Sequence, residues 1–203
     1  CTEEYNGSSW STQNALSQAR ECLAGAGTQT AALAIGGENT VSGGTQCSTE
    51  EYNGAVWSGG GNLINGGRRL AGAGTQTAGL AFGGFGSSYI PLSCTEEYNG
   101  ATWSAGGALS IARYTLAGAG TQTAGLAIGG INTNYYLVAA TEEYNGATWS
   151  AGGNLATARW KLAGAGTQTA GLAMGGSDFV TGTHTCTEEY NGATWSTGGA
   201  LAT

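Results

Sequence analysis

Histidine, proline, methionine and basic residues are scarce in this chain of 203 residues. It holds one histidine, one proline and one methionine, and lysine and arginine together number six. Six basic residues are too few for a nucleic-acid surface, which needs clustered cations against the phosphates. No run approaches the roughly 18 consecutive apolar residues of a membrane-spanning helix. We therefore expect neither nucleic acid as a partner nor insertion into a membrane.

Charged residues make up only 9% of the chain, against roughly 25% in an average soluble domain, whereas glycine contributes 39 residues. Disorder is not expected, because 40% of the residues are hydrophobic, six are tryptophan and the net charge is only −7. Collagen is excluded, because the glycines have no three-residue period. The length suits one compact domain of ordinary size.

Two sequence phrases recur every 46 or 47 residues, which indicates stacked copies of one structural unit. A tryptophan follows each copy of the first phrase, Thr-Glu-Glu-Tyr-Asn-Gly, which begins at Thr2, Thr49, Thr95, Thr141 and Thr187. The second phrase, Leu-Ala-Gly-Ala-Gly-Thr-Gln-Thr-Ala, begins at Leu23, Leu70, Leu116 and Leu162. We divide this single repeat domain into a half unit and four full units: 1–22, then about 23–69, 70–115, 116–161 and 162–203.

Each full unit contains four short segments typical of strands, here named a, b, c and d. In the third unit they are 116–120, 124–130, 141–144 and 147–150. Asn145-Gly146 between c and d predicts a type I′ hairpin, in which both turn residues have positive φ. No apolar stripe holds a helical period. Four strands in about 46 residues is the size of a propeller blade, so we expect an all-β protein, a β-propeller of four to five blades.

The strand count leaves the closure of the propeller open. Four units and one c–d half give 18 strands, whereas rings of four or five blades need 16 or 20. The missing a and b strands of a five-bladed ring are then either outside this chain or supplied by a neighbouring chain, or a four-bladed ring carries a spare hairpin. An open stack of glycine- and alanine-rich sheets is a further alternative.

The unit resembles the kelch repeat. In kelch repeats Gly-Gly closes the second strand, a tyrosine lies on the third and a tryptophan on the fourth, and these positions correspond here to Gly129, Gly130, Tyr144 and Trp149. The near-identity of the copies also resembles repeat arrays in structural proteins of marine bacteriophages. That second likeness implies a component of a virion surface or fibre and brings no catalytic residues with it.

Catalytic and metal sites are not expected. Some kelch-like propellers are copper oxidases, but such a site needs several converging ligands, and His184 is the only histidine. Asp178, the only aspartate, lies on the same variable loop, and we assign no catalytic role to the pair. We expect no cofactor and no enzymatic activity.

The glutamate pairs have a structural and a functional interpretation. Neighbours on a strand point to opposite faces, so one carboxylate of each pair can face the next blade. Arg20, Arg113 and Arg159 recur at the right frequency to be partners between blades, although the second unit has Gly67 at this position. The alternative is a ring of carboxylates that binds Ca²⁺. Cys1, Cys47, Cys94 and Cys186 are interpreted as buried small residues, since equivalent positions on successive blades lie beyond the reach of a disulfide. Cys22 lies on a different connection and can pair with a neighbour or with another chain.

Differences between the copies concentrate in two kinds of connection. The b–c connections are 38–46, 85–93, 131–139 and 177–185, and the d–a connections are 21–22, 68–69, 114–115 and 160–161. In an up-and-down blade both kinds lie at one end, which we call the variable face. Its candidate ligand-binding residues are Arg69, Phe85, Tyr89, Tyr135, Tyr136, Trp160, Asp178, Phe179 and His184. Exposed aromatic and arginine residues are typical anchors of recognition surfaces, but drift in unconstrained loops produces the same variation.

These observations predict a structural and adhesion module that displays variable loops to a cell-surface glycan or receptor. The resemblance places it on a virion surface or in another extracellular setting, with other virion or fibre proteins as partners. The alternative is a purely structural repeat protein that self-associates into a ring or filament without a ligand.

Overall fold

The computed structural model describes residues 1–39 and 43–202, and within them the chain forms β-strands and no helix. None of these residues therefore belongs to a long apolar helix able to cross a membrane. Four antiparallel sheets of four strands are arranged as the blades of a β-propeller, about 46 residues apart along the chain. The predicted all-β propeller class is confirmed.

The strands of each blade follow one another in chain order from the inside outwards, joined by antiparallel pairing. Blade 1 contains β4 (Ala24–Thr28), β5 (Ala31–Ile35), β7 (Thr49–Tyr52) and β8 (Trp57–Gly59). Blade 2 contains β9 (Ala71–Thr75), β10 (Ala78–Phe82), β11 (Thr95–Tyr98) and β12 (Trp103–Ala105). Blade 3 contains β14 (Ala117–Thr121), β15 (Ala124–Ile128), β17 (Thr141–Tyr144) and β18 (Trp149–Ala151). Blade 4 contains β19 (Ala163–Thr167), β20 (Ala170–Met174), β21 (Thr187–Tyr190) and β22 (Trp195–Thr197).

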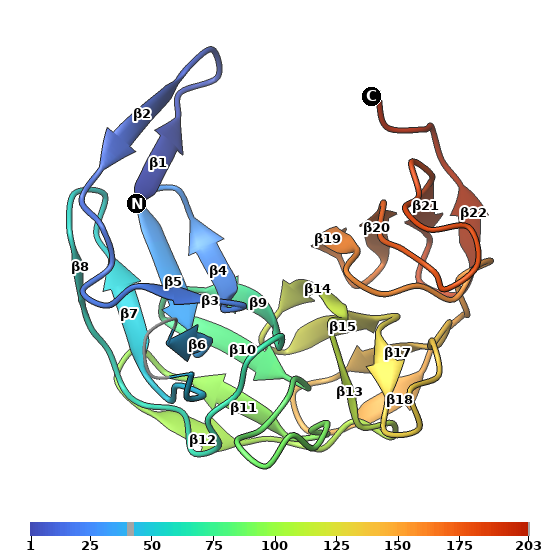
Figure 1. Cartoon of the computed structure of the whole chain (residues 1–203), viewed down its shortest axis with the longest axis horizontal. Helices are drawn as coiled ribbons and strands as arrows, with labels where there is room; N and C mark the ends of the chain where they lie inside the picture. The colour runs from blue at the N-terminus through green and yellow to red at the C-terminus, as the bar shows by residue number, and fades with distance from the viewer. Residues whose placement is uncertain (40–42, 203) are drawn as a thin grey trace.

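The N-terminal residues form half a blade. β1 (Thr2–Tyr5) and β2 (Trp10–Gln13) pair as a hairpin equivalent to the c and d strands. Figure 1 shows this hairpin at one end of an arc and blade 4 at the other, with an opening between them. A closed four-bladed ring is therefore not what the chain forms.

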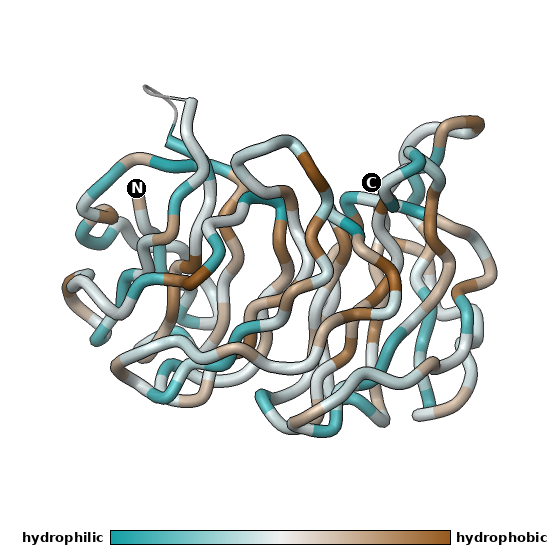
Figure 2. The backbone as a smooth tube through the Cα atoms, turned by 90° about the horizontal axis from the view of Figure 1, so that it is seen from below, coloured by the Kyte–Doolittle hydropathy of each residue, from teal (hydrophilic) through white to brown (hydrophobic). Residues whose placement is uncertain are grey.

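Four further short strands lie in the variable connections. β3 (Arg20–Glu21) pairs with β6 (Glu38–Asn39), and β13 (Arg113–Tyr114) pairs with β16 (Ile131–Asn132). Each pair joins a d–a connection to the b–c connection that follows it. Both kinds of connection therefore lie on the same face, as the up-and-down pattern predicts. Figure 2 views the arc from the side, with connections at both ends of the blades.

The inner strands are built from glycine and alanine because neighbouring blades approach closely there. The inner strands of successive blades lie side by side along the whole arc. A Cβ on Gly118 would lie 2.7 Å from the carbonyl oxygen of Gly72 in the preceding blade. Larger side chains at these positions would separate the blades, so the close approach of the blades accounts for the small residues of the Ala-Gly-Ala-Gly phrase.

The prediction for the c–d turn is wrong in detail. In blade 3, strand d begins only at Trp149, and the connection spans four residues closed by the amide of Asn145 donating to the carbonyl of Thr148. Gly146 has positive φ whereas Asn145 does not. The Asn145 side chain instead accepts hydrogen bonds from the amides of Ala147 and Thr148. An Asx turn thus replaces the type I′ turn.

Candidate functional site

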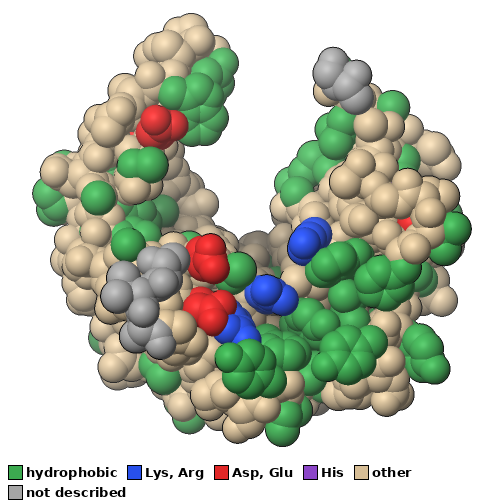
Figure 3. Space-filling model, viewed as in Figure 1, with side chains coloured by type: hydrophobic (Ala, Val, Ile, Leu, Met, Phe, Trp, Pro, Cys, Tyr) green, Lys and Arg blue, Asp and Glu red, His purple; other side chains and the backbone are tan. Residues whose placement is uncertain are grey.

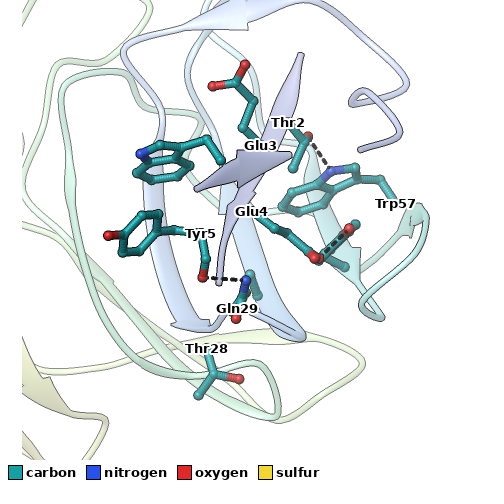
Figure 4. A pocket seen from close by; sticks show the side chains of 10 residues that line it. Thr2, Glu3, Glu4, Tyr5, Thr28, Gln29 and Trp57 are labelled. Carbon is teal, nitrogen blue, oxygen red and sulfur yellow. Dashed lines mark hydrogen bonds between the residues drawn. The ribbon is translucent and has the colours of Figure 1, made fainter. Parts of the chain in front are cut away.

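The tyrosine and tryptophan of each repeat hold neighbouring blades together through their polar atoms. In blade 3, the hydroxyl of Tyr144 donates to Glu97 of blade 2 over 2.6 Å, and the indole N–H of Trp149 donates to the hydroxyl of Thr95 over 2.8 Å. The same two bonds recur at the other interfaces, including that of the half blade (Figure 4), where Trp57 donates to Thr2. The second glutamate of each pair therefore accepts the hydrogen bond from the tyrosine of the next blade.

The glutamine of Thr-Gln-Thr adds a third connection between blades. The side-chain amide of Gln122 donates to two carbonyls of the preceding blade, those of Gly79 at 3.0 Å and Tyr98 at 2.7 Å. Gln76 and Gln168 make equivalent bonds, and Gln29 donates to the carbonyl of Tyr5. These hydrogen bonds explain why the Thr-Gln-Thr turn has the same sequence in all full units.

The first glutamate of each pair forms a buried ion pair in three blades. Arg113 lies 3.0 Å from Glu142, and both side chains are almost fully buried. The Arg113 guanidinium also donates to the carbonyls of Gly129 and Ala140. Burial lowers the pKa of Arg113 to about 10, and the charge of Glu142 opposes this shift.

The expected pairing of arginine and glutamate between blades is therefore only partly right. The side chain of Arg113 binds the blade that follows it, whereas its backbone carbonyl accepts a hydrogen bond from Gly84 in the preceding blade. The predicted exception in the second unit is also explained. Glu96 has no arginine partner among the described residues and accepts instead from the backbone amides of Ile64 and Asn65.

The tyrosine, tryptophan, glutamine and glutamates common to the repeats thus make contacts between or within blades, whereas the residues that differ between repeats lie on the variable face. Phe85, Tyr114 and Ile131 form a hydrophobic cluster on this face, with Leu137 and Trp160 packed against it. Phe85 was expected as an exposed ligand-binding residue, but only 8% of it is exposed. It supports the loops from below because its b–c connection folds back over it. Trp160 is half-buried.

Four aromatic side chains do project from the variable face. The exposed fractions are 66% for Tyr89, 69% for both Tyr135 and Tyr136, and 61% for Phe179. Tyr89 and Tyr135 have φ of 58° and 61°, a left-handed conformation that is uncommon for bulky residues and clusters at functional positions. Figure 3 looks onto this face and shows hydrophobic side chains spread across it.

A small pocket on the variable face lies between the b–c connections of blades 1 and 2. It measures about 220 Å³ and is lined by Arg68, Tyr89, Thr45, Ser87 and neighbouring glycines. The Arg68 guanidinium lies 4.7 Å from the centre of the Tyr89 ring and forms an ion pair with Glu38. Arg68 lines this pocket, whereas its neighbour Arg69, the candidate from the sequence, is exposed and is not part of the lining. The sequence places two arginines side by side at this connection, and only the structure decides which of them lines the pocket.

Asp178 and His184 do come together, in the last variable loop. His184 Nε2 lies 3.2 Å from Asp178 Oδ2. The same carboxylate accepts hydrogen bonds from the backbone amides of Thr181 and Val180, which lower the pKa of Asp178. The carboxylate is therefore occupied in shaping the loop that carries Phe179. Among the described residues no three His, Cys, Asp or Glu side chains gather as a metal site, so the carboxylate ring for Ca²⁺ is not assembled there.

Burial decides the prediction for the cysteines. Cys1 and Cys47 are exposed and Cys94 and Cys186 are partly exposed, so the prediction that these four cysteines are buried is wrong. Cys22 is partly exposed, and all five cysteines are unpaired. Beside the half blade, a pocket of about 340 Å³ is lined by Tyr5, Trp10 and blade 1 (Figure 4). It lies between the half-blade hairpin and blade 1.

The fold and the face together define a class, a β-propeller framework of near-identical blades that displays one face of variable loops. Comparison of the sequence with protein-family models and with curated proteins finds no match. The class is therefore the level at which the structure identifies this chain.

Proposed function

We propose that this protein is a non-enzymatic recognition module whose variable face binds a cell-surface glycan or receptor. One observation carries the proposal: four of the side chains that differ between repeats and remain exposed are large aromatics, Tyr89, Tyr135, Tyr136 and Phe179, and all four lie on one face. Neutral drift of surface loops has no preference for tyrosine over small polar residues. Aromatic side chains, in contrast, bind sugar rings and protein surfaces with little loss of conformational entropy.

The framework supports this role by holding the loops in fixed positions. The backbone of the third b–c loop closes through the Tyr135 amide donating to the carbonyl of Asn132, and the Asn132 side chain accepts from the amides of Asn134 and Tyr136. Both tyrosines thus project from a short, internally bonded turn. A preorganised turn loses less freedom on binding than a mobile loop.

An adhesive role at a virion surface or in another extracellular setting is part of the proposal and rests on the likeness to phage repeat arrays. The kelch-like blade describes the framework and adds no activity. Other virion or fibre proteins are the partners that such a setting implies.

The direct test is the replacement of Tyr135 and Tyr136 by alanine, with Val56→Ala as the matched control. Val56 is 45% exposed and lies in a c–d turn, on the opposite face. A fluorescently labelled chain is measured on a glycan array and on intact cells. We expect the double variant to lose at least about tenfold in binding, the range of an interface hot spot, and the control to bind normally. Unchanged binding by the tyrosine variant contradicts the proposal.

Self-association is a second candidate, and the two ends of the arc favour it. Tyr5 and Trp10 are 45% and 67% exposed at the N-terminal end, while their equivalents at internal interfaces pack on the preceding blade. At the other end, Leu172 and Met174 are half-buried, whereas the equivalent Leu126 and Ile128 are fully buried. A concentration-dependent native mass by light scattering is expected if the ends join copies. A monomer at all concentrations contradicts it.

A further inference from the structure

The chain places its unpaired positive charges in one ring. Four of the six basic residues are buried and form ion pairs with glutamates, which are Arg20–Glu50, Arg68–Glu38, Arg113–Glu142 and Arg159–Glu188. The other two, Arg69 and Lys161, are exposed, and no ion pair joins them to a described acidic residue. In a protein with a net charge of −7, these two residues are the exposed basic side chains that form no ion pair with a described acidic residue.

Arg69 and Lys161 occupy equivalent positions on the d–a connections, together with Cys22 and Thr115. These four residues, defined here as the axial ring, are linked from blade to blade by backbone hydrogen bonds. The amide of Arg69 donates to the carbonyl of Cys22, that of Thr115 to Arg69, and that of Lys161 to Thr115, over 2.7, 2.9 and 3.0 Å. Each precedes the innermost strand of its blade, so the ring borders the central hollow on the variable face. Figure 3 shows Lys and Arg side chains gathered there.

The backbone of the axial ring is suited to glycine, yet none of the four residues is glycine. Their φ values lie between 53° and 55°, in the left-handed region that side chains with a Cβ occupy at a cost. A chain with 39 glycines has the residue that would remove this strain. Strained side chains kept at equivalent positions indicate a role for the side chains themselves.

Aromatic surface adjoins both cations. The Lys161 ammonium lies 4.2 Å from the centre of the Trp160 ring. Arg69 lies close enough to Tyr114 to oppose the rise in the pKa of Tyr114, which burial and the nearby Tyr135 cause. An exposed acidic residue, Glu21, lies next to Cys22, so the positive side of the ring runs from Arg69 through Thr115 to Lys161.

We propose that the axial ring binds the anionic groups of an acidic saccharide, with Arg69 and Lys161 as the cations and Thr115 between them. The inference rests on the proposed function, because it names the ligand class of the same face. Carboxylate or sulfate groups match the two cations, and a sugar ring matches the partly exposed Trp160 beside Lys161.

The test uses glycine substitutions, which remove the charge and relieve the backbone at the same time. Arg69→Gly, Lys161→Gly and the double variant are compared with Cys22→Gly, which changes the same ring without changing charge. The probes are a sulfated disaccharide and a galacturonate disaccharide, each with a neutral counterpart, measured by titration calorimetry at two salt concentrations. Thermal unfolding of each variant is followed in parallel.

We expect both anionic probes to bind the wild-type chain more tightly than their neutral counterparts, and the binding to weaken with salt. Each single variant should bind at least about tenfold more weakly, since a charge-assisted hydrogen bond contributes about that factor. The double variant should not bind detectably, while Cys22→Gly binds as the wild type. None of the glycine variants should unfold at a lower temperature.

Other outcomes separate this inference from the proposed function. Equal binding of neutral and anionic probes, or anion binding that survives in the double variant, overturns the axial ring as an anion site and leaves recognition by the tyrosines intact. Binding that requires Arg69 and Lys161 but not Tyr135 and Tyr136 supports the axial ring as an anion site and contradicts the proposed role of the two tyrosines. No binding of any anionic probe overturns the inference even where cell binding is retained.

Discussion

Contacts between blades and the variable face follow opposite rules in this molecule. Between blades, the same hydrogen bonds recur at each interface with almost the same lengths, as Tyr98, Tyr144 and Tyr190 show by donating to Glu51, Glu97 and Glu143 over 2.5 to 2.6 Å. On the variable face no loop repeats another. The difference teaches that repetition here marks residues that bind neighbouring blades, whereas the variable face combines a few packed residues such as Phe85 with exposed loop residues.

Removal of a buried arginine should cause the largest loss of stability in the repeated framework. Arg113→Ala leaves Glu142 buried without its partner, and we expect a loss of about 3–5 kcal/mol in the free energy of unfolding, measured by guanidinium titration. Glu142→Gln and Glu96→Gln are a matched pair, because Glu96 is held by backbone amides instead of an arginine. Equal losses in the two glutamine variants would contradict the importance of the ion pair.

A core truncation should come next in size. Leu126 is fully buried in the cluster between blades 3 and 4. Leu126→Ala removes apolar contacts and leaves a cavity, for an expected loss of about 2–5 kcal/mol. Leu201→Ala, at the uncovered end, is the control and should cost less, because Leu201 is 44% exposed. The measurement is again the denaturant midpoint.

Removing one hydroxyl tests a single connection between blades. Tyr144→Phe loses the bond to Glu97, and we expect a loss of about 1–2 kcal/mol. Burial first, and then the bond to Glu97, raise the pKa of Tyr144 to about 12. Folding thus favours the neutral phenol, so its contribution to stability is complete below about pH 10 and is lost as the pH rises towards 12.

Urea unfolding at pH 9 and at pH 11.5 measures this dependence. The wild type should lose more stability than Tyr144→Phe over that interval. An identical decrease in both proteins would show that Tyr144 does not contribute to the alkaline dependence.

The smallest effect is expected on the variable face. Replacing 133–136 by four residues of glycine and serine should change the free energy of unfolding by less than about 0.5 kcal/mol, as for surface changes away from packed features. The same change should remove ligand binding. A large loss of stability would mean that the loop belongs to the framework after all.

Much of the framework could be predicted from the sequence because its signals are local and repeated. The period of 46 residues, the short strands and the small residues of Leu116–Gly120 indicate one blade per unit, and the face that carries the differences follows from the order of strands. The burial of Phe85 could not be predicted, since it depends on Tyr114 and Ile131 from other connections. The conformation at Asn145 could not be predicted either, because the same Asn-Gly residues are compatible with both a type I′ turn and an Asx turn.

The sequence by itself determined the class of fold, one blade per period of about 46 residues and the residues that vary, because these follow from the repeat period and from the order of the short strands within it. The tertiary structure alone decided which glutamate connects blades, which arginine is buried and which is free, and how far the arc closes. Those outcomes depend on distances between residues about one repeat apart, such as Tyr144 and Glu97 or Arg69 and Thr115. Only stacking the blades brings such residues together.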